Sequence, residues 1–412
     1  MRDNLRIDGE RLMRRLDELA RIGALEGGGN CRLAFSDEDK AGRDLVVGWM
    51  REAGLTVSID RFGNVTGTRP GAEAGPPVMA GSHTDTVATG GKYDGTLGVL
   101  GALEVIETLN DAGITTRRPL AVTLFSNEEG ARFAPDMMGS QVYQGGLSLD
   151  EANAIEGIDG TTVGENLRRI DYVGDAPVGE PNACAFVEIH VEQGPILENE
   201  GKTIGAVDGV QGISWREYVI EGSSAHAGTT PMAARRDAGL AAARIVAMLE
   251  DIATSVGHGQ VATAGVIEVE PNLVNVVPHR AKITADLRNA DSELLKKAES
   301  RLDEAVQTVS QRYGVRVQQR ELARFEPTPF DPDMVGRIEK TAERLELPVR
   351  RLTSGAGHDA QIMARVSPTA MIFVPSVDGI SHNIEEFTHA SDCEAGVNVL
   401  LHTLLDLAEE AA

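Results

Sequence analysis

The sequence has few cysteines, and they are not spaced as a disulfide framework would require. Cys31, Cys184 and Cys393 lie far apart in the 412 residues, and no two of them form a Cys-x-x-Cys motif. Small secreted domains that depend on disulfides carry an even set of closely spaced cysteines. The sequence therefore predicts a protein of a reducing compartment, and we expect it in the cytoplasm.

Positive charge is also scarce. Lys and Arg number 39 against 63 Asp and Glu, which gives a net charge of −24 at pH 7. Nucleic acids and anionic membrane surfaces are bound through basic faces. The sequence therefore predicts neither partner, and an anionic small molecule would need specific cationic side chains in its binding site.

Long hydrophobic runs are missing as well. No segment approaches the roughly 20 apolar residues that cross a bilayer. Residues 1–23 form a charged segment with leucines at helical spacing, unlike the apolar core of a signal peptide. The hydrophobic fraction of 42% and the charged fraction of 25% are ordinary for a globular protein. We therefore expect a soluble enzyme or binding protein of two or three domains.

Most of the chain has the pattern of an α/β protein. Apolar runs at residues 77–80, 120–125, 185–189 and 370–374 predict strands that are buried on both faces, as in a mostly parallel sheet. Amphipathic segments between them predict helices. Gly95, Gly98 and Gly101 lack the G-x-G-x-x-G order of a dinucleotide site, so we interpret them as close helix packing. This part of the chain is the expected catalytic domain.

Residues 213–327 follow a different pattern. Alternating and amphipathic segments predict the order β-α-β-β-α-β of a ferredoxin-like fold. The expected helix opens at Thr230-Pro231 and runs to about Ala253, and a single strand is expected at 261–269. We therefore expect an inserted ferredoxin-like α+β domain at 213–327, between two parts of the catalytic domain at 1–212 and 328–412.

Polar side chains follow the ends of the buried strands, where open α/β sheets build their sites. These side chains are His83, Asp94, Glu128, Glu129, His190 and His382. Imidazole and carboxylate ligands together suit zinc and its first-row neighbours. The sequence therefore predicts two metal ions that share Asp94. His83 and His190 would complete one ion, and Glu129 and His382 the other.

Further carboxylates are placed to support this chemistry. Asp85, two residues after His83, would fix the orientation of its ring from behind. Glu128 and Glu129 are adjacent and would point to opposite sides of a strand. One of them can bind metal while the other faces a bound water, as the general base and then general acid of a metal hydrolase does.

Seven segments, in order, closely resemble one known family. They are GSHTDTVATGGKYDG, NEEGARF, HVEQGP, SAHAGTTPM, PNLVNVVPHRAKITADLR, SGAGHDA and GISHNIEE. They resemble the dinuclear metal amidohydrolases that cleave N-carbamoyl compounds, within the broader aminoacylase/carboxypeptidase superfamily. The resemblance extends from residue 81 to residue 386 and covers most of the chain.

The resemblance implies roles for individual residues. It implies two divalent metal ions per subunit, which would be Zn or, alternatively, Mn, Co or Ni. Their ligands would be His83, Asp94, Glu129, His190 and His382. Glu128 would be the catalytic acid/base, and a cis peptide would join Asp94 to Gly95. The substrate, a ureido compound with a carboxylate, would contact Gln193, His226, Asn275 and Arg288. His226 would also polarise the scissile carbonyl, supplied by the partner subunit of a homodimer that forms through the inserted lid domain.

The leading hypothesis is hydrolysis of an N-carbamoyl-L-α-amino acid to the amino acid, CO2 and ammonia. Allantoate and N-carbamoyl-β-alanine are rival substrates, and a general aminoacylase, a dipeptidase or an inactive metal-binding protein are further alternatives. Without the resemblance, a solvated surface charge is the favoured interpretation of Arg288, and a residue at the entry of a helix is an equal alternative for His226. His358-Asp359 is interpreted as a pair that shapes the floor of the site. His279 and Ile384 depart from the family pattern at local turns.

Overall fold

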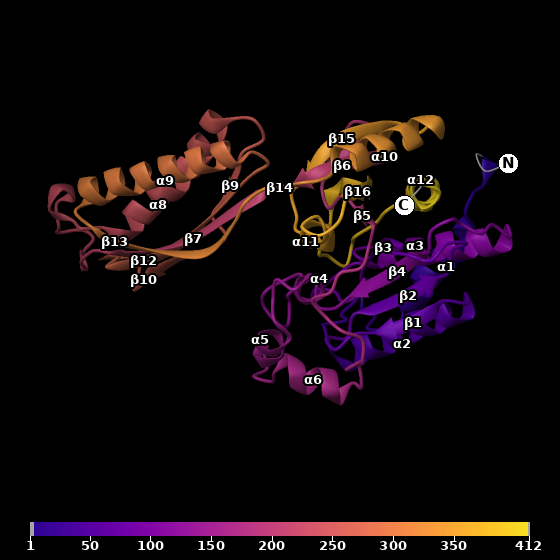
Figure 1. Cartoon of the computed structure of the whole chain (residues 1–412). Coiled ribbons are helices and arrows are strands. Elements are labelled where there is room, and N and C mark those ends of the chain that lie inside the picture. The colour runs from indigo at the N-terminus through magenta and orange to yellow at the C-terminus, as the bar shows by residue number, and fades with distance from the viewer. Residues whose placement is uncertain (1–3, 411–412) are drawn as a thin grey trace. The chain divides into compact units, whose positions relative to one another are not determined.

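The computed structural model describes residues 4–410, which fold as two compact units (Figure 1). The larger unit contains the chain up to Asp208 and from Pro329 onward, and the smaller unit contains Gly209–Thr328. The smaller unit therefore interrupts the larger one in sequence. Its limits lie within a few residues of the expected domain at 213–327.

A nine-stranded sheet forms the centre of the larger unit. Its central strands are parallel to one another, in the order β4 (Leu120–Phe125), β3 (Val78–His83), β5 (Ala185–Val191) and β16 (Thr369–Val374). Every residue of these four strands is buried, which explains their continuous apolar character. The α/β class with a mostly parallel central sheet is thus confirmed.

Antiparallel strands extend the sheet on both sides. β1 (Thr56–Ile59) and β2 (Val65–Arg69) lie beyond β4, and β6 (Ile204–Val210) lies beyond β16. β14 (Thr328–Pro329) and β15 (Val349–Ser354) both neighbour β6. The sequence pattern did not predict β6 or β15, because glycines interrupt the first and two arginines the second.

Helices of the larger unit pack on this sheet. α3 (Thr96–Asp111) and α12 (Ala390–Ala408) contact each other and the central strands, whereas α11 (Asp359–Met363) contacts β5 and β16. The other helical segments are α1 (Gly9–Leu19), α2 (Asp37–Glu52), α4 (Met138–Gln144), α5 (Leu149–Ala154), α6 (Val163–Arg169), α7 (Ile196–Asn199), α10 (Pro332–Arg344) and a short 3-10 turn at Val377–Gly379. Within residues 4–410, no helix combines the length and the apolar character that crossing a membrane requires.

The glycines of α3 allow it to lie unusually close to the sheet. A Cβ atom on Gly98 would be 2.6 Å from the Cβ of Ser82 and 2.8 Å from the carbonyl oxygen of Ile189. A Cβ on Gly101 would be 2.9 Å from a methyl group of Val397 in α12. The interpretation of this glycine spacing as close helix packing is therefore confirmed.

The smaller unit has a five-stranded antiparallel sheet. Its order is β10 (Ile267–Glu270), β12 (Arg280–Asn289), β7 (Gly212–Glu221) and β13 (Arg316–Phe325), and β9 (Val261–Thr263) also pairs with β12. Helices α8 (Ala238–Val256) and α9 (Ser292–Tyr313) share one hydrophobic core with the inward-facing residues of β7 and β12. With β9 and β10 counted as one interrupted strand, the chain order is β-α-β-β-α-β.

Two expected elements of this unit were wrong. Helix α8 begins at Ala238 rather than at Thr230-Pro231, because the Asp237 side chain caps it by accepting the N–H of Leu240. The preceding residues form the short strand β8 (Ala225–His226), paired with β11 (Val276–Val277), and a 3-10 turn at Met232–Ala234. The strand expected at 261–269 is divided into β9 and β10 around Gly265, where the absence of a side chain weakens a strand.

We predict that Gly98→Ala lowers the free energy of unfolding by about 1–3 kcal/mol, because the new methyl group must displace backbone and side-chain atoms in a packed core. Gly48→Ala in α2 is the matched control. A Cβ there meets nothing within 4 Å, so the better helix propensity of alanine should stabilise the protein by about 1 kcal/mol or less. Urea unfolding measures both changes, and stabilisation by Gly98→Ala would contradict the close packing.

Candidate functional site

Six polar residues of the larger unit meet at the carboxyl ends of its parallel strands. His83 ends β3, His190 lies near the end of β5, and Glu128 with Glu129 follow β4. Asp94 lies in the loop between β3 and α3, and His382 follows β16. Parallel strands deliver their following loops to one edge of the sheet. Residues up to three hundred positions apart in sequence are therefore neighbours.

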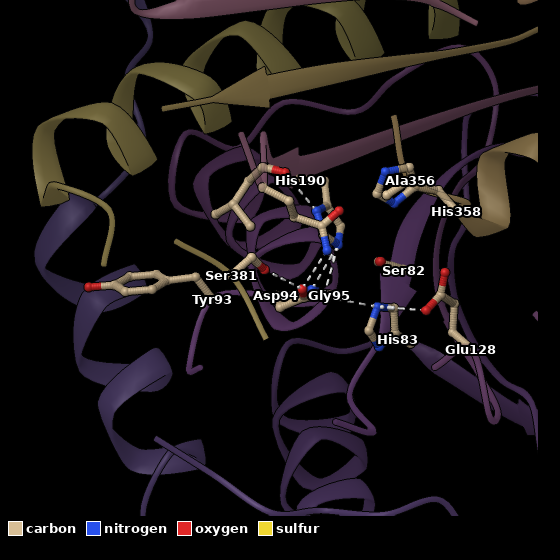
Figure 2. A network of polar contacts seen from close by, with 12 residues as sticks. Ser82, His83, Tyr93, Asp94, Gly95, Glu128, His190, Ala356, His358 and Ser381 are labelled. Carbon is tan, nitrogen blue, oxygen red and sulfur yellow. Dashed lines mark hydrogen bonds and ion pairs between the residues drawn. The ribbon is translucent and has the colours of Figure 1, made fainter. Parts of the chain in front are cut away.

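The first ligand group is His83, Asp94 and His190 (Figure 2). Their ligand atoms all lie within 4.8 Å of one another, and all three residues are buried. The Oδ1 atom of Asp94 is 3.5 Å from Nε2 of His83 and 3.3 Å from Nε2 of His190. Two imidazole nitrogens and one carboxylate oxygen thus converge on one point.

The second ligand group is Asp94, Glu129 and His382, whose ligand atoms also lie within 4.8 Å of one another. Nε2 of His382 is 3.5 Å from Oδ2 of Asp94 and 3.3 Å from Oε2 of Glu129. The two groups share Asp94, which presents one oxygen to each. The structure thus brings the predicted ligands together in the predicted pairs.

Hydrogen bonds fix the tautomers of the two buried histidines. Nδ1 of His83 lies 2.9 Å from the carbonyl oxygen of Asp85, and Nδ1 of His190 lies 2.9 Å from that of Val191. A carbonyl only accepts, so each Nδ1 carries a proton and each Nε2 faces Asp94. A protonated Nδ1 held by a carbonyl is the orientation that leaves Nε2 to bind a metal.

Asp85 supports the site differently from what the sequence suggested. It is the backbone carbonyl of Asp85 that accepts from His83, since the carboxylate is 3.9 Å away. The carboxylate instead accepts the backbone N–H groups of Glu128 at 3.3 Å and Glu129 at 3.2 Å. Asp85 therefore holds the loop that carries both glutamates, in addition to orienting His83.

The expected cis peptide between Asp94 and Gly95 is not found. Among residues 4–410 the cis peptide bonds precede Pro135 and Pro271. The turn into α3 is made instead by Gly95 itself, which has a φ of +63°. Its N–H donates to Nε2 of His190 at 3.0 Å.

Glu128 belongs to neither ligand group, although it lies beside them. Its Oε2 atom is 3.4 Å from Nε2 of His83, and the side chain is almost completely buried. Burial raises the pKa of Glu128 well above its ordinary value, and the nearby carboxylates of Asp359 and Glu129 raise it further. A buried carboxyl with a strong affinity for a proton, next to a metal position, is suited to moving a proton during hydrolysis.

Asp94 has the opposite electrostatic character. Burial alone would raise its pKa, but the charges and hydrogen bonds of His190 and His83 hold the pKa well below the ordinary value. Burial and the charge of Asp94 together raise the pKa of Glu129 well above its ordinary value. Asp94 is thus the carboxylate that stays ionised, as a bridging ligand must be.

The donor set fits a pair of divalent ions. Each ligand group combines imidazole with carboxylate, and the three carboxylates of Asp94, Glu128 and Glu129 are crowded in a buried place. Buried like charges are unfavourable unless cations compensate them. The residues that would hold the two ions are His83, His190 and Asp94 for one, and Glu129, His382 and Asp94 for the other.

The predicted substrate amide Gln193 is also at this site. Its Nε2 donates to Oδ2 of Asp94 at 2.8 Å, and its Oε1 has no hydrogen-bond partner. Gln193 has a φ of +58°, and its backbone N–H donates to the hydroxyl of Ser376. The side chain of Gln193 is therefore directed at the carboxylate that the two ligand groups share.

The pair His358-Asp359 lies in the floor of the site, as interpreted from the sequence. The ring of His358 is 4.5 Å from that of His190, and its Nε2 contacts the hydroxyl of Ser354 at 3.0 Å. Glu188, which the sequence reasoning missed, forms a further buried group with these two histidines. Its charge within the buried strand β5 was the only signal in the sequence that could have indicated it.

The remaining predicted residues lie in the smaller unit. His226 in β8 pairs with Val276 in β11, next to Asn275, so that these two predicted residues are neighbours. Arg288 lies elsewhere, on β12. Its Nε and Nη2 atoms donate to Asp286, and its guanidinium carbon is 5.8 Å from the ring centre of Trp215. The departure at His279 is accommodated by a contact with the hydroxyl of Ser224, and Ile384 packs against Gly29.

Comparisons with known proteins agree on one family. The model of peptidase family M20/M25/M40 matches residues 79–406. The chain is 42% identical over 408 residues to an N-carbamoyl-L-amino-acid amidohydrolase of Rhizobium meliloti. That match covers 99% of this chain and 98% of the relative. The chain is 34% identical to a ureidoglycolate hydrolase of Arabidopsis thaliana, over 98% of this chain and 88% of the relative.

A solved structure extends this agreement to the fold. The crystal structure of a hydantoinase/carbamoylase-family amidase from Burkholderia multivorans matches with a TM-score of 0.96 and 46% identity. The match covers 99% of this chain and 100% of that chain. The two proteins thus share both units and their order in the sequence.

We predict that Asp94→Ala loses both metal ions, because Asp94 supplies one oxygen to each ligand group. Elemental analysis after dialysis measures the metal content. Glu128→Gln is the matched control, since Glu128 is in neither group. It should retain both ions while activity falls by about 10²–10⁴-fold. An Asp94→Ala protein that keeps two tightly bound ions would contradict the shared ligand.

Proposed function

The chain belongs to peptidase family M20/M25/M40 and is a hydrolase of linear amide C–N bonds, and we propose that its substrate is an N-carbamoyl-L-α-amino acid. The products would be the amino acid, CO2 and ammonia. The observation that carries this proposal is the position of Glu128, a buried carboxyl that contacts His83 yet lies outside both ligand groups. Full-length identity to N-carbamoyl-L-amino-acid amidohydrolases supports the choice of substrate.

The proposed chemistry uses Glu128 twice. Two divalent ions bound to the ligand groups would polarise the scissile carbonyl and lower the pKa of the attacking water. Glu128 removes a proton from that water as it attacks the ureido carbonyl, and then delivers a proton to the nitrogen of the amino acid as the C–N bond breaks. The carbamic acid released decomposes to CO2 and ammonia. The imidazole of His226 stabilises the negative charge that develops on the carbonyl oxygen.

Arg288 is the proposed binding site for the substrate carboxylate. A protein of net charge −24 must attract an anion locally, and a guanidinium matches a carboxylate in geometry. Arg288 lies in a row that crosses the sheet, opposite Val261 on β9 and Ile213 on β7, and Ile213 lies opposite Phe325 on β13. Trp215 adds an aromatic ring beside the guanidinium.

The surroundings of Arg288 favour an apolar substrate side chain. Directly opposite residues of an antiparallel sheet share one face, so this row places apolar groups on both sides of the cation. Val261, Phe325 and Trp215 are 49%, 41% and 38% exposed, which is unusual for large apolar side chains next to a charge. We therefore propose that these residues contact the side chain of a bound L-amino acid.

A substrate panel tests this function. N-carbamoyl derivatives of apolar L-amino acids should release ammonia faster than N-carbamoyl-β-alanine or allantoate, which lack an apolar side chain beside the carboxylate. They should also exceed their D-forms, which cannot direct the carboxylate, the side chain and the ureido carbonyl to the same three places. The assay uses protein loaded in turn with Zn, Mn, Co and Ni. Preferential cleavage of allantoate would favour the rival hypothesis instead. Cleavage of N-acyl amino acids alone would favour a general aminoacylase.

Arg288 and His226 lie at opposite ends of the smaller unit's long strands. The pair Arg288–Ile213 lies near one end of the β7–β12 ladder, and the pair Arg280–Glu221 lies at the other end. The strand between them spans about 27 Å, at roughly 3.4 Å per residue. The two segments of the chain stay paired beyond that end, where the N–H of Gly222 donates to the carbonyl of His279 and His226 lies opposite Val276. Arg288 and His226 of one copy are therefore too far apart to contact the same N-carbamoyl amino acid.

We propose that the protein is a homodimer in which the smaller unit serves as both lid and dimer contact. Each active site would then take Arg288 from one subunit and His226 with Asn275 from the other. The residues around this pair support a contact between copies. Met232, Leu273 and Val274 are exposed apolar side chains near His226 and Asn275 in sequence, and such groups are typical of protein interfaces.

Mixing two inactive variants should restore activity if the sites are shared. In a hybrid of Arg288→Ala and His226→Ala subunits, one of the two sites contains both intact residues. Random reassembly of equal amounts should therefore recover about a quarter of the wild-type activity, because half of the dimers are hybrid and each has one intact site. Ammonia release before and after mixing measures the recovery.

A second mixture identifies which residue crosses the interface. Glu128→Gln mixed with Arg288→Ala should stay inactive if Arg288 acts on the site of its own subunit, whereas Glu128→Gln mixed with His226→Ala should recover. Failure of every mixture, with hybrid dimers demonstrated by mass, would overturn the shared site.

A further inference from the structure

Glu386 lies under the metal site and holds its bridging ligand from behind. Its Oε1 atom accepts the backbone N–H of Tyr93 at 3.0 Å and that of Asp94 at 3.2 Å. Its Oε2 atom is 3.2 Å from the hydroxyl oxygen of Ser381. That hydroxyl oxygen is 3.1 Å from Oδ2 of Asp94 (Figure 2). Both carboxylate oxygens are thus used, and the side chain is only 6% exposed.

Gly91 provides the space that the carboxylate of Glu386 occupies. A Cβ atom on Gly91 would be 2.1 Å from Oε1 of Glu386 and 2.2 Å from its carboxyl carbon. Any side chain at position 91 would therefore push Glu386 away from the N–H groups of Tyr93 and Asp94. Gly91 has an ordinary φ, so the need for glycine here comes from Glu386 and not from the backbone conformation.

Glu386 joins two segments that supply ligands from opposite ends of the sequence. It lies four residues after His382, in the segment that follows β16, and it binds the backbone of Asp94, almost three hundred residues earlier. The ligand group of Asp94, Glu129 and His382 needs these segments at a fixed separation. No helix or strand connects them at this point, and the three contacts of Glu386 supply that connection.

We propose that Glu386 is a positioning residue that fixes Asp94 relative to His382 and thereby makes the two metal positions form together. This inference rests on the proposed dinuclear site. Glu386 is not itself a ligand, because its two oxygens face Tyr93, the backbone of Asp94 and Ser381 rather than the convergent nitrogens. Its role is comparable to that of the groups that orient metal ligands elsewhere, whose loss typically weakens metal binding about 10–100-fold.

Metal titration of apo-protein tests this role. Glu386→Ala should weaken binding of both ions by about 10–100-fold. Glu386→Gln should weaken it by less than about threefold, because the amide oxygen still accepts both N–H groups and the amide nitrogen still reaches Ser381. Isothermal titration with Zn or Mn alone gives both affinities without any reference to turnover.

Glu104→Gln is the matched control for burial of a carboxylate. Glu104 is also fully buried and accepts a backbone N–H, from Asp8, but it contacts α1 and not the metal site. This variant should lose thermal stability while its metal affinities stay at the wild-type values. A general loosening of the fold is thereby separated from a local loss of ligand placement.

Gly91→Ala tests the same contact through a substitution in the loop that precedes Asp94. It should reproduce the loss of metal affinity seen in Glu386→Ala, because the new methyl group would lie 2.1 Å from Oε1 and 2.5 Å from Cβ of Glu386 and must displace that side chain. Wild-type affinity for both ions in a folded Glu386→Ala or Gly91→Ala protein would overturn the positioning role. If wild-type protein itself binds fewer than two ions, the dinuclear proposal fails instead, and the two failures are distinguishable.

Discussion

The structure depends on one shared carboxylate. Asp94 is buried, ionised and placed between three imidazole rings, and each of its oxygens faces a different ligand group. A buried charge of this kind is tolerated only where partners compensate for the lost hydration. The parallel centre of the sheet makes that possible, because the loops after β3, β4, β5 and β16 all arrive at the same edge. The fold and the chemistry are therefore linked through the position of a single side chain.

Hydrogen bonds to backbone groups fix the positions of the ligand residues. Asp85 uses its carbonyl for His83 and its carboxylate for the N–H groups of Glu128 and Glu129. The carboxylate of Glu386 likewise accepts the backbone N–H groups of Tyr93 and Asp94. A hydrogen bond to a backbone N–H fixes the direction of the adjoining side chain without competing for its ligand atoms. Ligands and supports can therefore be close together in space while each keeps its own partner, which rigid placement of a metal site requires.

The sequence predicts those features that depend on periodicity or on residue type. The buried strands, the glycine packing of α3 and the ligand pairing around Asp94 all follow from such local signals. The start of α8 does not, because a side-chain cap at Asp237 outweighs the proline that normally opens a helix. The support from Glu386 was missed for another reason. Its motif was visible, but backbone N–H groups are the same at every residue type, and the glycine at position 91 does not indicate which distant side chain needs the space.

The smaller unit gives the strongest constraint on how the enzyme is assembled. A strand ladder has a fixed rise, so the distance from Arg288 to the far end of the β7–β12 ladder does not depend on side-chain rotation, and the β8–β11 pair that contains His226 follows beyond that end. Hinge motion of the whole unit leaves that separation unchanged. If both residues contact one substrate, as the proposed chemistry requires, the second must come from another copy of the chain. Under that proposal, a second copy of the chain is a condition for completing the active site.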